Sequence, residues 1–152
     1  MPEYLLIDGK NKIMGRLASQ VAKLALLGNR VVVINAKDIV ISGSKKNIFE
    51  KFIQRKNIKT LTNPRRGPFF YRRPDRFFRR VVRGMLPWKK PRGREAYKRI
   101  HVFVNDVEDK NKYPVLIPYE IENADLTRLK GKYVRLEEVG NRFGWKNITN
   151  NN

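Results

Sequence analysis

The sequence predicts an α/β fold in which helices pack on a mainly parallel β-sheet. Residues 31–34 form a β-branched apolar run without a polar side chain, as expected of a strand covered on both faces. A second apolar run lies near the N-terminus, and apolar residues recur at helical spacing after each run. Strands that alternate with helices in this way usually lie parallel to one another. The length of 152 residues suits one domain spanning residues 1–152.

The first elements follow from apolar spacing and from the residues that end each run. Residues 4–7 are apolar and are followed by Asp-Gly, which predicts a strand and a turn. Apolar residues recur at helical spacing over 17–25, and Gly28 provides a C-terminal stop for that helix. The run at 31–34 is the next strand, and residues 38–41 are a second short strand or an extension of it.

The segment Ser42-Gly43-Ser44 precedes a further predicted helix. Its inner face would consist of Ile48, Phe49, Phe52 and Ile53. The serines can cap this helix, because a side-chain oxygen at that position accepts from a free backbone N–H. With Lys45 and Lys46, the same segment could also bind an anion at the helix N-terminus. Both interpretations, a plain cap and an anion site, remain open.

The central part of the chain combines loops with one helix. Residues 60–73 contain two proline dipeptides and adjacent arginines, and we predict an extended loop. Pro74 suits the first turn of a helix that continues to Leu86. Residues 89–94 are predicted to be a basic loop, too rich in proline and glycine for a helix. A short helical stretch is expected around residues 96–97.

The last third gives weaker signals. Residues 101–104 have the composition of a strand. Beyond them we predict a short helix near residues 125–129, and a strand and turn within residues 132–145. Residues 146–152 are expected to form a polar tail.

Positive charge is concentrated in the middle of the chain. The sequence has 34 Lys and Arg against 14 Asp and Glu, a net charge of +20. Residues 45–99 hold 20 of these basic residues and only 3 of the acidic ones. So much charge repels itself in a compact fold unless a polyanion neutralises it, and nucleic acid is the first candidate.

The helix predicted from Pro74 to Leu86 divides into two halves. One half carries Phe77, Phe78, Val81, Val82, Met85 and Leu86, with Asp75 at its edge; the other carries Arg76, Arg79, Arg80 and Arg83. A solvated face is the alternative interpretation, but such faces mix charges, because like charges three or four residues apart repel. Arginine also grips phosphate with two parallel hydrogen bonds. We therefore predict phosphate binding by the arginine half.

Basic residues also flank this helix in irregular segments, which can follow the surface of a folded RNA better than that of duplex DNA. We assign Phe77 and Phe78 to the core. For Phe69, Phe70, Tyr71 and Trp88, base stacking and packing remain equal alternatives. The predicted RNA-binding residues are Lys45, Lys46, Arg65, Arg66, Arg72, Arg73, Arg76, Arg79, Arg80, Arg83, Lys89, Lys90, Arg92, Arg94, Lys98 and Arg99.

Catalytic chemistry finds little support in the sequence. The absence of cysteine excludes disulfides, thiolate metal sites and thiol nucleophiles. His101 is the only histidine and lies in a predicted strand, and acidic residues cluster only over 106–109. No cofactor-binding glycine motif is present. We therefore expect no enzyme activity, cofactor, metal or small-molecule substrate, and an RNA-modifying enzyme is kept as an alternative.

A basic amphipathic helix can also lie on an anionic membrane. That alternative is weakened here because Phe77 and Phe78 are needed for the core, and because loops on both sides share the charge. The sequence shows no secretory signal and no apolar run of the ~20 residues that a membrane span needs. We expect a cytoplasmic protein without a membrane partner.

Three sequence blocks carry a family resemblance. The first is Gly15-Arg16-Leu17-Ala18-Ser19, and the second comprises residues 31–36 with Ile41-Ser42-Gly43. The third comprises Arg73-Pro74-Asp75-Arg76, residues 82–87 and Arg92-Gly93. In this order, and over roughly residues 4 to 104, they resemble the universal large-subunit ribosomal protein family L-thirteen, of archaeal or eukaryotic type.

The resemblance implies a three-layer α/β/α fold with a four-stranded, mainly parallel sheet and basic loop and helix extensions. It also implies a structural constituent of the large ribosomal subunit that binds and organises rRNA during assembly, beside neighbouring ribosomal proteins. Arg73, Arg76, Arg83, Lys89, Lys90 and Arg92 fall in the basic block of that family. Gly84 and Gly93 would allow close approach or a tight turn. A basic RNA-binding protein outside the ribosome is the alternative.

Overall fold

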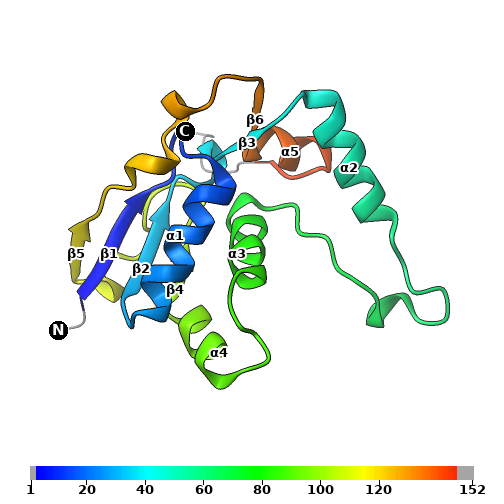
Figure 1. Ribbon diagram of the computed structural model, residues 1–152. Coiled ribbons are helices and arrows are strands. Elements are labelled where there is room, and N and C mark those ends of the chain that lie inside the picture. Colours follow the sequence, from blue (N-terminus) through cyan, green and yellow to red (C-terminus); the bar gives the residue numbers. More distant parts are fainter. Residues whose placement is uncertain (1–2, 147–152) are drawn as a thin grey trace.

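Four parallel strands form the central sheet of the computed structural model, which describes residues 3–146 (Figure 1). In spatial order they are β4 (Ile100–Val102), β2 (Arg30–Ile34), β1 (Glu3–Asp8) and β5 (Val115–Pro118). Every neighbouring pair is parallel. The predicted α/β class with a four-stranded, mainly parallel sheet is therefore confirmed.

The helices and a second, smaller sheet surround these strands. The α-helices are α1 (Met14–Leu26), α2 (Lys45–Asn57), α3 (Pro74–Gly84), α4 (Pro91–Lys98) and α5 (Leu136–Arg142). Single 3₁₀ turns are η1 (Ala36–Asp38), η2 (Pro64–Arg66), η3 (Lys110–Lys112), η4 (Glu122–Ala124) and η5 (Leu126–Arg128). The smaller sheet pairs β3 (Val40–Ser42) with β6 (Tyr133–Arg135) in antiparallel fashion, next to α2 and α5 (Figure 1).

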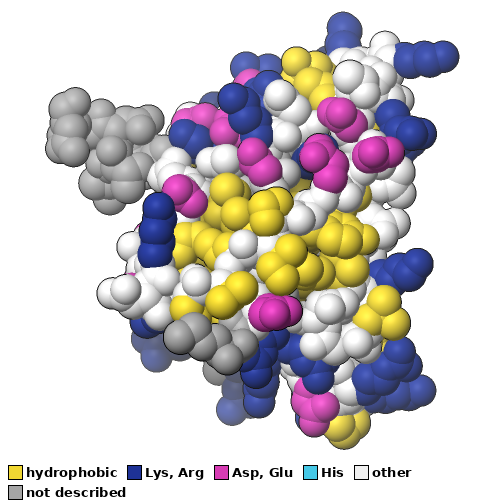
Figure 2. All heavy atoms as spheres, turned by 90° about the vertical axis from the view of Figure 1, so that its left-hand side faces the viewer, with side chains coloured by type: hydrophobic (Ala, Val, Ile, Leu, Met, Phe, Trp, Pro, Cys, Tyr) yellow, Lys and Arg dark blue, Asp and Glu magenta, His cyan; other side chains and the backbone are white. Residues whose placement is uncertain are grey.

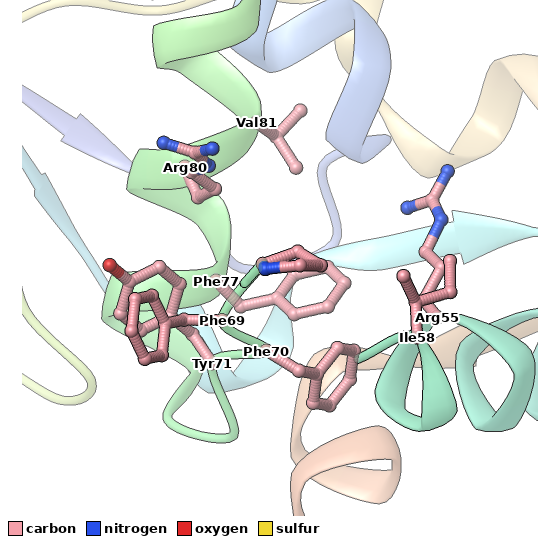
Figure 3. Close-up of a pocket in the computed structure, with 9 residues that line it drawn as sticks. Arg55, Ile58, Phe69, Phe70, Tyr71, Phe77, Arg80 and Val81 are labelled. Atoms are coloured by element: carbon pink, nitrogen blue, oxygen red, sulfur yellow. The ribbon is translucent and has the colours of Figure 1, made fainter. Parts of the chain in front are cut away.

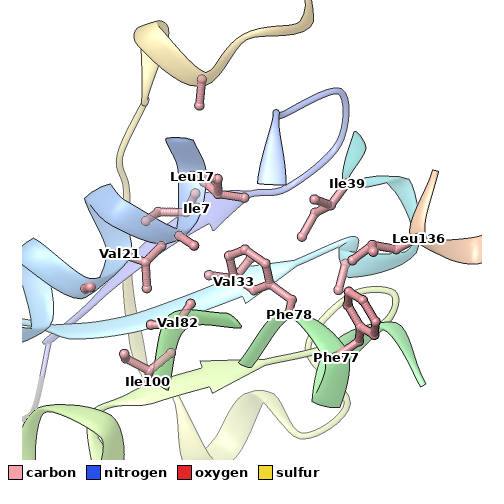
Figure 4. Close-up of a cluster of buried hydrophobic side chains, with 14 of the residues drawn as sticks. Ile7, Leu17, Val21, Val33, Ile39, Phe77, Phe78, Val82, Ile100 and Leu136 are labelled. Atoms are coloured by element: carbon pink, nitrogen blue, oxygen red, sulfur yellow. The ribbon is translucent and has the colours of Figure 1, made fainter. Parts of the chain in front are cut away.

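One face of the main sheet is covered by α1 and α3, and the main core lies there (Figure 4). The connections from β1 to β2 and from β2 to β4 advance in one direction across the sheet. Right-handed crossovers therefore place their helices on the same face. The fully buried residues that meet there include Ile7, Val33 and Ile100 from the sheet, Leu17 and Val21 from α1, and Phe78 and Val82 from α3.

The opposite face is crossed by the connection from β4 to β5, because the chain there returns in the other direction. Tyr113, near the end of this connection, packs its ring edge-on against Tyr4 at 4.9 Å and His101 at 5.5 Å between ring centroids. This thin layer is consistent with a three-layer arrangement. Figure 2 shows the side where β5 and β1 lie, with apolar side chains gathered at its centre and acidic ones around them.

Between α2 and α3 the chain makes a long excursion away from the sheet (Figure 1). The loop predicted over 60–73 is confirmed, apart from the turn η2. The outgoing and returning limbs of the excursion touch at Thr60 and Gly67. A Cβ added at Gly67 would lie 2.9 Å from the backbone nitrogen of Thr60.

Most other elements agree with the prediction, including the strands at 4–7 and 31–34, the helix over 17–25 and the strand near 101. Residues 38–41 contribute a separate short strand, β3, which belongs to the smaller sheet and not to the main one. The helix expected near 125–129 is replaced by the turns η4 and η5. The tail predicted over 146–152 lies outside the described residues, except for Lys146.

Two expectations need correction, and one strand was not predicted. The segment 89–94 was predicted to be non-helical, but α4 begins at Pro91 and contains Arg92, Gly93 and Arg94. Proline is favourable in a first helical turn, so it begins this helix instead of breaking it. The turn expected after β6 is wrong as well, because the chain forms α5 there. Strand β5 was not predicted, although its Val-Leu-Ile run between two prolines is a strand signal.

Of the two glycines that the resemblance singled out, only Gly93 shows a close approach within the chain. A Cβ at Gly93 would lie 2.1 Å from the carbonyl oxygen of Pro87, whereas one at Gly84 would meet nothing within 4 Å. Gly93 is buried, and its small size lets α4 pack against the end of the segment that follows α3.

We expect Gly93→Ala to lower the free energy of unfolding by about 2 kcal/mol, because the added methyl group forces the backbone at Pro87 to move. Urea denaturation followed by circular dichroism measures this change. Gly84→Ala is the matched control, and it should leave stability unchanged or raise it by up to about 1 kcal/mol. Equal effects of the two substitutions would contradict the packing described for Gly93.

Candidate nucleic-acid interface

The helix α3 is held by its apolar side, and this orientation decides where its arginines point. Phe78 and Val82 are buried against α1 and the sheet, and Phe77 is buried beside Phe52 of α2 (Figure 4), which confirms the core assignment of the two phenylalanines. At the first turn, the Asp75 carboxylate accepts hydrogen bonds from the Arg76 backbone N–H at 2.9 Å and the Arg73 guanidinium at 3.1 Å. An acidic residue here also complements the helix dipole.

The four arginines predicted to form one solvent-facing half of α3 fall into two groups. Arg76 and Arg80 are exposed. Arg79 is half-buried: its guanidinium lies 4.1 Å from the centre of the Tyr97 ring and donates a hydrogen bond to the Tyr97 carbonyl at 3.3 Å. The Arg83 guanidinium lies 4.0 Å from the centre of the Trp88 ring. Two arginines are therefore fixed by aromatic rings, and two are free to reach a ligand.

Several other predicted RNA-binding residues also have partners within the chain. Arg72 donates to the Phe143 carbonyl at 3.2 Å, Arg94 to the Trp88 carbonyl at 3.0 Å and Arg99 to the Ala25 carbonyl at 2.9 Å; Lys45 lies 3.6 Å from Glu138. A guanidinium that makes one internal bond still has donors left for a phosphate. The three arginines are therefore held in place and keep unused N–H donors.

The remaining predicted residues are exposed. Within residues 3–146, no side-chain hydrogen bond or ion pair is found for Lys46, Arg65, Arg66, Arg76, Arg80, Lys89, Lys90, Arg92 or Lys98. They are distributed over the N-terminal end of α2, the excursion, α3, the segment before α4 and both ends of α4. The candidate interface is therefore extended and contains both cations with partners in the described chain and exposed cations without them.

Two hollows bring parts of this set together. The larger, with a volume of about 840 Å³, is lined by Arg72, Arg73 and Arg76 beside Gly144 and Trp145. The smaller lies between the C-terminal end of α2, the excursion and α3 (Figure 3). It contains Arg80 together with Arg55, which the sequence analysis did not single out. The only signal for Arg55 was its place in the basic segment 45–99.

The four aromatic residues whose role was open fall into a packed pair and an exposed pair. Phe70 packs on other aromatic rings, with centroid distances of 5.0 Å to Phe143 and 6.0 Å to Phe77. Trp88 packs edge-on against Tyr97 at 5.1 Å. In contrast, Phe69 is 68% exposed and Tyr71 is 36% exposed. Packing therefore explains Phe70 and Trp88, whereas Phe69 and Tyr71 remain available to a partner.

At the start of α2, the Ser44 hydroxyl accepts a hydrogen bond from the Asn47 backbone N–H at 3.3 Å. Ser44 is therefore an N-cap, as one of the two interpretations predicted. The anion site at Ser42-Gly43-Ser44-Lys45-Lys46 stays a prediction.

The sole histidine is part of an aromatic cluster. His101 is half-buried against Tyr4 and Tyr113. Burial lowers the pKa of His101 below its ordinary value of 6.5, and the positive charge of Arg79 lowers it further. Among residues 3–146, no group of three or more His, Asp or Glu side chains could hold a metal ion. No helix in the described chain is long and apolar enough to cross a membrane.

Comparison with known proteins identifies the family. A family model described as Ribosomal protein L13 matches residues 2–109. The chain belongs to the ribosomal protein L13 family. The matched range includes the three blocks whose resemblance the sequence analysis described over roughly 4 to 104, and that prediction is confirmed.

Curated relatives of this L13-family chain extend over most of its length. The protein named large ribosomal subunit protein uL13 from Methanopyrus kandleri is 43% identical over 148 residues, covering 95% of this chain and 89% of the relative. The uL13 of Methanococcus maripaludis is 42% identical, covering 93% and 98%, respectively. That of Archaeoglobus fulgidus is 39% identical, covering 96% and 91%.

We expect a pKa below 6.5 for His101 of this L13-family chain when its ring protons are titrated by NMR. Arg79→Gln should raise this pKa, but not to 6.5, because burial remains the larger cause. The folded state disfavours the protonated, charged form of the His101 ring. The free energy of unfolding should therefore decrease as the pH falls through 6.5. His101→Gln should remove that part of the pH dependence. A pKa above 6.5 would contradict the described surroundings of the ring.

Proposed function

We propose that this chain is a structural constituent of the large ribosomal subunit, in the cytoplasm, that binds and organises large-subunit rRNA. The single observation that carries the proposal is the exposed set of basic side chains over residues 45–99, presented by α3 and its flanking loops. The names of its relatives support the same role.

In this proposal, the neutral α/β body is a platform and the basic segment is the contact surface. Exposed residues such as Arg76, Arg80, Lys89 and Arg92 neutralise phosphates, and the release of counterions provides much of the affinity. Arg79 and Arg83, which lie on aromatic rings, present guanidinium groups in fixed positions. Fixed donors select a particular phosphate geometry, so the shape of the folded RNA determines specificity.

We further propose that the chain is not an enzyme and requires no cofactor or metal. Ribosomal proteins of this family are structural components, and the lone histidine of the chain packs against two tyrosines. Its partners are rRNA and, generally, neighbouring proteins of the large subunit. Neither a membrane nor a small-molecule substrate is part of this proposal.

The first test follows the chain through a sucrose gradient of a cell lysate with a high-salt wash. We expect it to sediment with the large subunit, because many distributed phosphate contacts resist washing. If it remains at the top of the gradient, the ribosomal role is wrong and a free RNA-binding protein becomes the better hypothesis.

We expect the double variant Arg76→Gln/Arg80→Gln to bind large-subunit rRNA about ten-fold more weakly than the wild type at moderate salt. The slope of log K against log salt should become less steep by roughly 0.7 to 0.9 for each arginine removed. Filter binding over a series of salt concentrations measures both quantities. The matched control is Arg128→Gln/Lys130→Gln, which removes two exposed charges outside residues 45–99. An equal loss in both double variants would contradict the assignment of the interface to the central segment.

A further inference from the structure

Residues from three segments of the chain line the smaller hollow beside α3 (Figure 3). Ile58, just after α2, forms one side and Phe77 of α3 forms the floor. Phe69 and Tyr71, from the returning limb of the excursion, lie on the opposite side. The hollow has a volume of about 280 Å³ and opens to solvent. That is just below the range of ~300 to 1,000 Å³ typical of sites for drug-sized ligands, so it suits a single small planar group.

The exposure of the aromatic rings at this hollow is not explained by packing within the chain. Phe70, between Phe69 and Tyr71 in sequence, packs into a cluster with Phe77 and Phe143. Its two neighbours point the other way along the extended chain: Phe69 is 68% exposed and Tyr71 is 36% exposed. Leaving a phenylalanine ring in water sacrifices most of the stabilisation that its burial would give. A ligand that covers these rings would recover it.

The charge around the hollow restricts the chemistry of that ligand. Among the residues that the structure describes, Arg55, Arg80 and Tyr71 are the ionisable lining residues, and no acidic residue lines the hollow. Arg80 is exposed to solvent. The Arg55 guanidinium lies 5.5 Å from the centre of the Phe52 ring. The best ligand therefore combines a flat, apolar-faced body with negative charge on either side. A nucleotide in a single-stranded segment has this combination, because its base stacks and its flanking phosphates are anionic.

We propose that this hollow binds one unstacked nucleobase of RNA. The base stacks against Phe69 and Tyr71, and the phosphates on its two sides contact Arg55 and Arg80. The inference rests on the proposed function, since it specifies how part of the same RNA is bound. It adds a base-stacking contact to a surface otherwise described by phosphate contacts. The role left open for Phe69 and Tyr71 is thereby assigned to stacking.

The experiment uses the full chain and purified large-subunit rRNA, with binding measured over a salt series. Stacking on an aromatic ring contributes ~1 to 3 kcal/mol per base, so Phe69→Ala should weaken binding roughly 5- to 150-fold. Because stacking releases no counterion, the salt slope should stay that of the wild type. Phe69→Leu keeps an apolar side chain but has no π-face and should also weaken binding, whereas Phe69→Trp should retain it. Thermal denaturation of the Ala and Leu variants should match the wild type, since Phe69 is largely exposed.

A second measurement identifies the contact directly. Ultraviolet irradiation of the complex should join an RNA base to Phe69 or Tyr71, and mass spectrometry of the digested complex locates the linked peptide. If Phe69→Ala and Phe69→Leu bind as the wild type and no linked peptide is found, the base site is wrong. The rRNA-binding role would then still stand, provided that Arg76→Gln/Arg80→Gln weakens binding. If the wild type itself fails to bind rRNA, the proposed function fails and the base site fails with it.

Discussion

The burial of the apolar side of α3 is the interaction on which the rest of the molecule depends. Phe78 and Val82 are fully buried against α1 and the central sheet, and Phe77 is nearly so. Each such side chain contributes ~1.5 to 3 kcal/mol when it is removed from water. The same packing turns the opposite side of the helix outward, and with it a dense row of arginines whose mutual repulsion opposes folding. The core therefore offsets the electrostatic strain that the surface creates.

The arginines of this surface differ in how much freedom they keep, and aromatic residues make the difference. Tyr97 and Trp88 come from the segment after α3, and each carries a guanidinium within about 4 Å of its ring. Arg76 and Arg80 have no such support in the described chain. Preordered cations lose little entropy when they bind, whereas mobile ones adapt to the shape that they meet. In the proposed function, a surface with both kinds would recognise a fixed fold of RNA and still tolerate small differences in it.

The sequence predicted best those features that depend on local periodicity. The main strands, α1 and the amphipathic character of α3 follow from apolar spacing, and the fold class follows from their alternation. What could not be predicted depends on distant contacts. The position of the Arg79 guanidinium depends on Tyr97, eighteen positions later in the chain. Phe70 is packed whereas its neighbours Phe69 and Tyr71 are exposed, and this difference depends on Phe143, from the far end of the chain. Strand β5, in contrast, had a signal in its own sequence.

The long excursion between α2 and α3 is anchored at both ends by folded helices, and its two limbs touch at Thr60 and Gly67. It therefore behaves as a closed loop and not as a free tail. The entropy of closing a loop is lost once, when the body folds, and grows only slowly with loop length. Fewer conformations then remain to be lost on docking. A segment tethered in this way is already partly ordered before it meets a partner, whereas an untethered arm of the same composition would lose all of its conformational entropy at the moment of binding, which lowers affinity.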